Sequence, residues 1–172
     1  MRSWTPKTKL PDFLEWESHQ PDRWELIEGM SHRVPAGEDA HEQLLDALVG
    51  RIHAQLDSRR YTVMSRARVL TPHGDALFPD FVITAADAPP GPTSIAETLV
   101  VGEVLSGSTE GLDRGRKWHA VRTIPSVQHY VLGDPAENRL EVYSRGRDWR
   151  YAVVEAGDVL HLPAVDVTFD WS

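Results

Sequence analysis

The sequence contains no cysteine among its 172 residues. Disulfide scaffolds, thiolate metal sites and thiol nucleophiles are therefore excluded. No run of about 18 apolar residues occurs, so no segment is expected to span a membrane. The first residues also lack the apolar core of a signal peptide. These absences predict a soluble, cytoplasmic protein with no membrane partner.

Positive charge is also scarce, because 18 Lys and Arg residues face 26 Asp and Glu residues and leave a formal net charge of −8. A broad basic surface for nucleic acid is therefore not expected. A small catalytic cleft remains compatible with this charge, since bound cations offset the negative charge of acidic metal ligands locally. The length suits one domain, which we expect over residues 1–172 with a core at about 22–160.

Several common catalytic motifs are missing. His41-Glu42 resembles the start of a zinc-protease motif, but Leu45 stands where the second histidine would be. The sequence has neither the G-x-S-x-G turn of serine hydrolases nor the G-x-G-x-x-G of dinucleotide sites. Residues 111–117 are glycine-rich and end in lysine, but they lack the Walker spacing.

Hydrophobic periodicity predicts a mixed α/β fold around a central sheet. The clearest element is a helix over about residues 39–58, with Asp39 as its N-cap and Glu42 three residues later. Residues 24–27 and 30–34 predict a hairpin across the turn at Gly29. The other expected elements are strands at 61–70, 81–83, 99–105, 127–132, 139–143 and 149–155 and a helix at about 112–122.

Three charged residues interrupt segments where apolar residues would be expected. Asp80 follows Pro79 at the start of a strand, Glu103 interrupts the apolar run at 99–105, and Lys117 lies on the helix that follows. A carboxylate in a buried strand is unfavourable unless it is paired or binds a metal. Two carboxylates on neighbouring strands would form a hard oxygen site suited to Mg²⁺ or Mn²⁺. We therefore predict one catalytic site built from these three residues.

Metal-dependent phosphodiester hydrolysis would require this combination of residue types. Carboxylate-held Mg²⁺ lowers the pKa of a bound water and polarises the phosphate. A nearby ammonium group can orient the water and stabilise developing negative charge.

Several sequence blocks carry a resemblance to a known family. They are Pro79-Asp80, Val101-Gly102-Glu103-Val104-Leu105-Ser106, Asp113 with Lys117, Trp24-Glu25-Leu26-Ile27-Glu28-Gly29, His41, and Val127-Gln128-His129-Tyr130-Val131-Leu132-Gly133-Asp134-Pro135. Together they resemble the Uma-two family of restriction endonucleases, within the PD-(D/E)XK nuclease superfamily. The resemblance covers about residues 10–160.

The resemblance implies a restriction-endonuclease-like PD-(D/E)XK fold, in which helices flank a central mixed sheet, with extra N-terminal and C-terminal β-hairpins. It also implies a Mg²⁺- or Mn²⁺-dependent endonuclease that acts on nucleic acid, with DNA and a homodimer as the expected partners. Asp80 and Glu103 would bind the metal, and Lys117 would replace the motif lysine, whose usual position holds Leu105. Gly102 and Val121 are further departures, since the family usually has a larger apolar residue and a tyrosine there.

Secondary site residues follow from the same reasoning. Glu28, His41 and Asp113 are candidates to line the cleft, although Asp113 also suits a helix start. The basic residues nearest in sequence to the site are expected to contact nucleic acid, and they are Arg66, Arg68, Arg114, Arg116 and Arg122.

Alternative interpretations remain open for each main residue and for the whole chain. Asp80 could cap a turn, Glu103 could pair with an arginine such as Arg68, and Lys117 could be a solvated helix residue. The chain could be a catalytically inactive module that binds nucleic acid or protein on the same fold. An unrelated acidic α/β protein would place Asp80 and Glu103 far apart.

Overall fold

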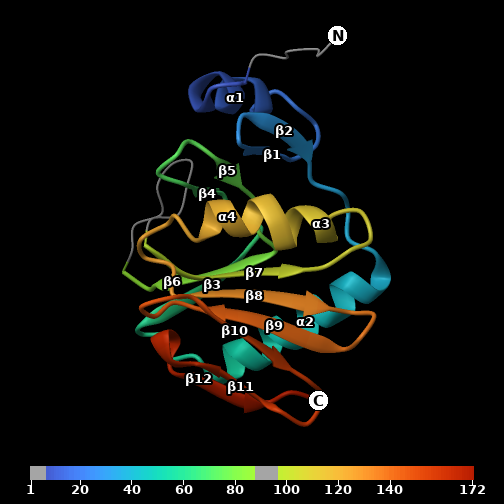
Figure 1. Cartoon of the computed structure of the whole chain (residues 1–172), viewed down its shortest axis with the longest axis vertical. Helices are drawn as coiled ribbons and strands as arrows, with labels where there is room; N and C mark the ends of the chain where they lie inside the picture. The colour runs from blue at the N-terminus through green and yellow to red at the C-terminus, as the bar shows by residue number, and fades with distance from the viewer. Residues whose placement is uncertain (1–6, 88–96) are drawn as a thin grey trace.

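The computed structural model describes residues 7–87 and 97–172, and a six-stranded sheet lies at its centre (Figure 1). Only the β7–β8 pair is parallel among the neighbouring strands described, so the sheet is mixed, as expected. From one edge to the other, the strands are β10 (Arg150–Val154), β9 (Arg139–Ser144), β8 (His129–Asp134), β7 (Thr98–Val104), β6 (Phe81–Ala85) and β3 (Tyr61–Ser65).

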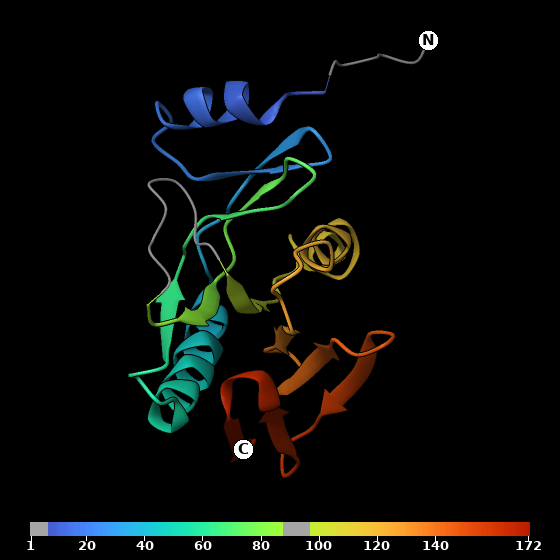
Figure 2. The same cartoon turned by 90° about the vertical axis from the view of Figure 1, so that its left-hand side faces the viewer.

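Helices cover opposite sides of this sheet (Figure 2). One side packs against α2 (Asp39–Gln55), whose leucines recur at helical spacing. The other side packs against a composite helix, which consists of α3 (Glu110–Leu112), a π-helical turn (Asp113–Lys117) and α4 (Trp118–Val121). No helix among the described residues is long and apolar enough to cross a membrane.

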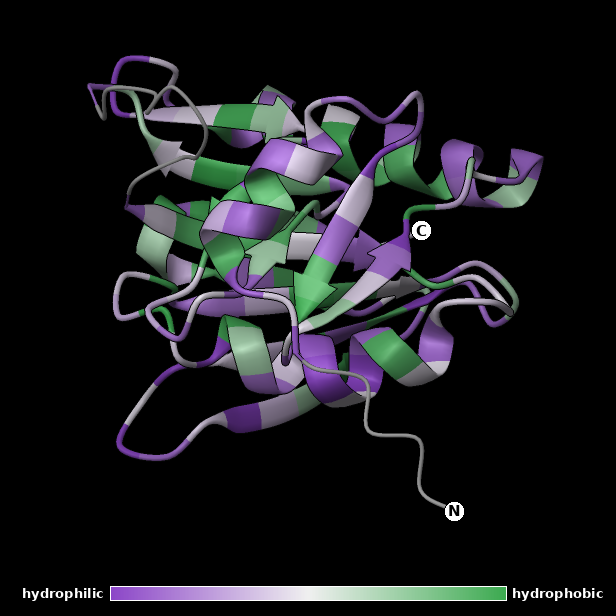
Figure 3. Cartoon of the chain, turned by 90° about the horizontal axis from the view of Figure 1, so that it is seen from above, coloured by the Kyte–Doolittle hydropathy of each residue, from purple (hydrophilic) through white to green (hydrophobic). Residues whose placement is uncertain are grey.

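Hydrophobic residues recur along the strands and helices of the chain (Figure 3). The alternation of side chains along β7 separates them into two core layers. Val100 and Val104 face α2, whereas Val101 and Leu105 pack on the side of the composite helix. Glu103 shares the side of Val101 and Leu105, so its carboxylate lies under the composite helix. Leu105, which stands at the usual position of the motif lysine, is buried in this core layer.

Gly102 is explained by its neighbour on β6. Gly102 pairs with Phe81 across the sheet, and a Cβ atom at residue 102 would lie 2.0 Å from Phe81 Cε1. The Phe81 ring therefore fills the space that a larger residue at this position would occupy. Val121, the other departure from the family pattern, is fully buried in the core beneath the composite helix.

A second, smaller sheet lies beside the composite helix (Figure 1). Its order is β2 (Met30–Arg33), β1 (Trp24–Ile27), β5 (Ala76–Leu77) and β4 (Val69–Leu70). Helix α1 (Leu10–Glu17) packs on it through Phe13. The single strand expected at 61–70 is wrong, because the backbone breaks at Arg66 (φ +52°) and its two ends join different sheets.

The C-terminal hairpin is formed by β11 (Val159–Leu162) and β12 (Val167–Asp170), joined by a 3₁₀ turn at Pro163–Val165. Leu160, Leu162 and Trp171 are buried in the same core layer as the leucines of α2. The core therefore extends past residue 160, the limit expected from the sequence.

Candidate active site

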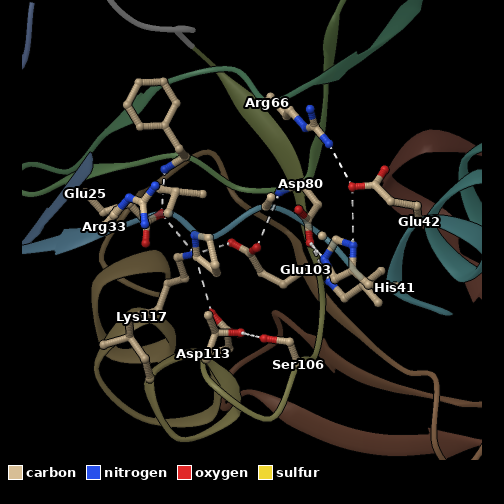
Figure 4. Close-up of a pocket in the computed structure, with 18 residues that line it drawn as sticks. Glu25, Arg33, His41, Glu42, Arg66, Asp80, Glu103, Ser106, Asp113 and Lys117 are labelled. Atoms are coloured by element: carbon tan, nitrogen blue, oxygen red, sulfur yellow. Dashed lines mark hydrogen bonds and ion pairs between the residues drawn. The ribbon is translucent and has the colours of Figure 1, made fainter. Parts of the chain in front are cut away.

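A cavity of about 70 Å³ opens where β6 begins and β7 ends, between the two sheets and the composite helix (Figure 4). Charged side chains dominate its lining, and they include Glu25, His41, Asp80, Glu103, Asp113 and Lys117. These residues come from five different segments of the chain, since Asp113 and Lys117 share one turn, so the cavity exists only in the folded protein.

Asp80 and Glu103 meet at neighbouring strand ends. Phe81 pairs with Gly102, and the next residues outward are Asp80 and Glu103. The Asp80 amide donates to Glu103 Oε2 at 3.3 Å, and the Val104 amide donates to Asp80 Oδ2 at 2.8 Å. The two carboxylates therefore share one side of the sheet, and the unrelated-fold alternative, which required them to be far apart, is wrong.

Lys117 reaches the same cavity from the composite helix. Its Nζ atom lies 2.8 Å from Glu103 Oε1, 2.9 Å from Glu25 Oε1 and 3.4 Å from Asp113 Oδ1. The residue is only 4% exposed, so the alternative of a solvated helix lysine is wrong. The π-helical turn contains both Asp113 and Lys117, and such turns frequently occur at functional sites.

Burial and excess negative charge dominate the electrostatics of this cluster. Burial raises the pKa of the Glu103 carboxyl well above its usual range, against the opposing effect of Lys117. Burial also raises the pKa of Asp113. Although burial disfavours the Lys117 ammonium, the carboxylates of Glu103, Glu25 and Asp113 raise its pKa well above the usual value. One ammonium thus faces three buried acidic side chains.

His41 lines the cavity, as the sequence analysis expected. Its Nε2 atom lies 3.0 Å from Asp80 Oδ2, and this hydrogen bond is the main reason why the pKa of His41 is raised. The imidazole and the Val104 amide together fix the orientation of the Asp80 carboxylate. Hydrogen bonds of this kind orient metal-binding carboxylates in proteins.

Glu28 does not line the cavity, and the carboxylate that does so from the same hairpin is Glu25. Glu28 stands at the turn with a φ of +52°, is 53% exposed at its side chain and lies 3.6 Å from Arg116. Glu25 is 4% exposed and sits on β1 between Trp24 and Leu26. The signal that identified Glu103, a carboxylate within an apolar run, was present at Glu25 as well.

The candidate arginines differ in whether they line the cavity. Arg66 lines the cavity and lies 2.8 Å from Glu42 Oε1, with Arg33, which was not expected, also lining it. Arg68 does not line the cavity, because it pairs with buried Glu17 and lies over the Phe78 ring. The same pairing rules out Arg68 as the main partner of Glu103.

The arginines of the composite helix lie outside the cavity. Arg114 points to the far side of the helix, where it pairs with Glu110 and Glu141. Arg116 is about half exposed beside Glu28. Arg122 is exposed near the end of the helix. Of the five expected arginines, Arg66 alone lines the cavity, and Arg33 lies there as well.

The donor set suits a hard divalent cation held by few protein ligands. Within residues 7–87 and 97–172, no group of three or more His, Asp or Glu side chains is arranged to hold a metal ion. Asp80 and Glu103 form a pair, and Mg²⁺ is commonly bound by one or two carboxylates together with water and substrate phosphates. Glu103 Oε1 is buried without a hydrogen-bond partner among the described residues, although Lys117 lies 2.8 Å away.

Two known proteins are similar to this chain over most of its length. The chain is 25% identical to protein sll1609 of Synechocystis over 84% of both chains, and 25% identical to slr1290 of the same organism over 95% of this chain and 89% of the other. Both relatives are uncharacterized proteins.

A solved structure shows the same fold. It is a crystal structure of a "putative nuclease" from Anabaena variabilis, with a TM-score of 0.73 and 19% identity over 92% of this chain and 90% of the other. This likeness confirms the restriction-endonuclease-like fold. The family described as "Putative restriction endonuclease" matches residues 10–171. The chain therefore belongs to the Uma-two family, and this membership supports a nuclease-like function.

Proposed function

We propose that the chain is a divalent-metal-dependent endonuclease that hydrolyses phosphodiester bonds in DNA. The observation that carries this proposal is the convergence of Asp80, Glu103 and Lys117 in one cavity, with Lys117 Nζ 2.8 Å from Glu103. Buried ionisable groups gathered in a cavity are typical of catalytic sites.

Asp80 and Glu103 would hold Mg²⁺ or Mn²⁺ through oxygen atoms. A bound divalent ion supplies a water of lowered pKa and neutralises charge on the phosphate. The excess of carboxylates in the cavity favours such an ion, because it offsets like-charge repulsion between Glu103, Asp113 and Glu25.

Lys117 acts as a cation and not as a base. Its raised pKa keeps the amine protonated at neutral pH, so Nζ can donate hydrogen bonds but cannot accept a proton. An ammonium group beside the scissile phosphate would stabilise the negative charge that develops on phosphate oxygens. His41 keeps the Asp80 carboxylate in a single orientation through the 3.0 Å hydrogen bond.

Contacts with the substrate are expected to be local. Arg33 and Arg66 line the cavity and have side chains that are 60% and 58% exposed. Each pairs with a partly exposed carboxylate, Asp22 and Glu42 respectively, and a substrate phosphate would have to replace that partner. A homodimer would allow both strands of a duplex to be cut, and sedimentation of the purified protein would detect it.

The test is cleavage of supercoiled plasmid in the presence of Mg²⁺ or Mn²⁺. We expect nicked or linear product from the wild type, none with a chelator, and a strong loss in Asp80→Asn. Asp46→Asn is the matched control, because Asp46 is an exposed carboxylate on α2 and does not line the cavity. Equal cleavage by wild type and Asp80→Asn would contradict the proposal.

A second candidate function is a non-catalytic module that binds nucleic acid or protein. The enclosure of Lys117 by three carboxylates favours it, as does the net charge of −8. Plasmid binding that needs a divalent ion but yields no product under any metal condition would support this alternative.

A further inference from the structure

Glu25 is a buried carboxylate of the cavity to which the proposed function assigns no separate role. It lies on β1 of the smaller sheet, whereas Asp80 and Glu103 stand at the ends of the central strands. Its side chain is 5% exposed. A buried carboxylate is costly unless it is paired and hydrogen-bonded, so its partners indicate why it is there.

Two donors converge on a single oxygen of Glu25. The Phe78 amide donates to Oε1 at 2.6 Å, and Lys117 Nζ lies 2.9 Å from the same atom. Phe78 is two residues before Asp80. The backbone segment that carries Asp80 into the cavity therefore also anchors Glu25.

These contacts close a ring around the cavity (Figure 4). Lys117 joins Glu25 to Glu103, Glu103 Oε2 accepts from the Asp80 amide, and the chain from Asp80 back to Phe78 returns to Glu25. A displacement of Glu25 would thus release one of the two closest anchors of the Lys117 ammonium.

The ring compensates for the position of the lysine on a helix. Lys117 is 14 residues after Glu103 and reaches it across the gap between helix and sheet. A lysine side chain is long and rotates freely, so contacts at its tip determine where the ammonium stays. Asp113 is the more distant of its carboxylate partners, at 3.4 Å.

We propose that Glu25 is a positioning residue, whose carboxylate, fixed by the Phe78 amide, holds the Lys117 ammonium against Glu103 in the catalytic arrangement. The predicted effect of Glu25 on turnover rests on the proposed nuclease function. The smaller sheet then contributes to the site itself and is more than a structural addition to the fold.

Lysine labelling tests the contact without any need for cleavage. The chain has three lysines, Lys7, Lys9 and Lys117, and the first two are exposed. Mass spectrometry after treatment with an amine-reactive reagent therefore reports Lys117 against two internal references. We expect slow modification of Lys117 in the wild type, faster modification in Glu25→Gln, and no change in Glu28→Gln. Unchanged protection of Lys117 in Glu25→Gln would overturn the proposal.

Plasmid cleavage supplies the second readout. Glu25→Gln keeps the acceptor for the Phe78 amide but removes the charge, so we expect kcat to fall on the order of 10- to 100-fold while KM stays unchanged. Glu28→Gln, on the same hairpin but outside the cavity, should retain wild-type turnover. Wild-type kcat in Glu25→Gln would overturn the role in catalysis.

Folding and the underlying activity are separated by two further comparisons. Glu25→Gln is used only if it unfolds in a cooperative thermal transition. If it does not, lysine labelling and plasmid cleavage are both measured on Glu25→Asp, which keeps the charge but is one methylene shorter. An absence of cleavage by the wild type would overturn the proposed function, whereas the labelling result would still decide whether Glu25 holds Lys117.

Discussion

The two sides of the central sheet differ in what they bury. The side under α2 and the C-terminal hairpin is almost entirely apolar, with Leu48, Ile52 and Trp171 among its fully buried residues. The side under the composite helix also has an apolar layer, but near its edge it encloses Glu103, Asp113 and Lys117. The same sheet therefore supports a conventional core on one side and a charged cavity on the other.

The contrast indicates which side stabilises the fold and which side is specialised. Apolar burial stabilises by roughly 25 cal/mol per Å² removed from water, whereas a buried ion pair often contributes no more than apolar residues of the same volume. Four buried charged residues in one cavity are therefore not explained by stability. The convergence of Glu25, Glu103, Asp113 and Lys117 from β1, β7 and the composite helix fits a site that binds ions and charged substrates.

The largest expected effect is on the charged side. Lys117→Ala should lower metal-dependent plasmid cleavage by on the order of 10²–10³-fold, because it removes the cation that faces developing negative charge. Metal binding should remain largely intact, since Asp80 and Glu103 are retained. Lys9→Ala, which alters an exposed lysine, is the control. Cleavage by Lys117→Ala at the wild-type rate would show that the displaced lysine has no catalytic part.

A second prediction concerns His129, a buried histidine on the parallel strand β8. Burial lowers its pKa to about 4, with a further contribution from His161. Because the folded state binds the proton less well than the unfolded state, this stabilising contribution is present above about pH 6.5 and is lost as the pH falls toward 4. The loss should reach up to about 3 kcal/mol.

His129→Gln isolates that contribution. Denaturant unfolding between pH 7 and pH 4 should show a smaller decrease in the free energy of unfolding for the variant than for the wild type. A parallel decrease in both proteins would mean that His129 titrates normally in the folded state.

Two glycine substitutions test how closely residues are packed on the α2 side of the sheet. Gly102→Ala places a methyl group against the Phe81 ring and should lower the free energy of unfolding by about 1–3 kcal/mol. Gly50→Ala adds the same methyl group on α2, where no atom outside the local helix backbone lies within 4 Å, and should raise the free energy of unfolding by about 0.5–1 kcal/mol. If Gly102→Ala had the same free energy of unfolding as Gly50→Ala, the close packing of Phe81 on residue 102 would be disproved.

The smallest effect is expected in DNA affinity. With Ca²⁺ present, two phosphate contacts from Arg33 and Arg66 should give a salt slope of about −2, at about −0.9 per contact. Arg66→Ala should reduce the slope by about 1, whereas Arg114→Ala, which changes a residue paired away from the cavity, should not alter it. A steep slope would reveal an extended basic surface elsewhere on the protein.

The sequence was sufficient to identify candidate site residues where a charged side chain interrupts or adjoins an apolar segment. Glu103 interrupts an apolar strand and Asp80 directly precedes one, so their types and positions predicted a shared site. Glu25 carries the same signal within Trp24-Glu25-Leu26-Ile27, but the hairpin gave no indication that β1 would face the central sheet across the cavity. That placement depends on packing between distant segments.

Backbone details account for most of the remaining differences. The positive φ at Arg66 breaks the expected strand, which leaves Arg66 at the cavity and turns Arg68 toward Glu17. The π-helical turn at Asp113–Lys117 directs Lys117 inward while Arg114 points away. Neither feature follows from hydrophobic periodicity, because both depend on one or two dihedral angles that the surrounding structure imposes.

The most direct test of the account is calorimetric titration of Mn²⁺ into the protein without DNA. We predict one ion bound per wild-type chain, a large loss of affinity in Asp80→Asn and in Glu103→Gln, and unchanged affinity in Asp46→Asn. Binding of Mn²⁺ by Asp80→Asn and Glu103→Gln with wild-type affinity would show that the carboxylate pair is not the metal site.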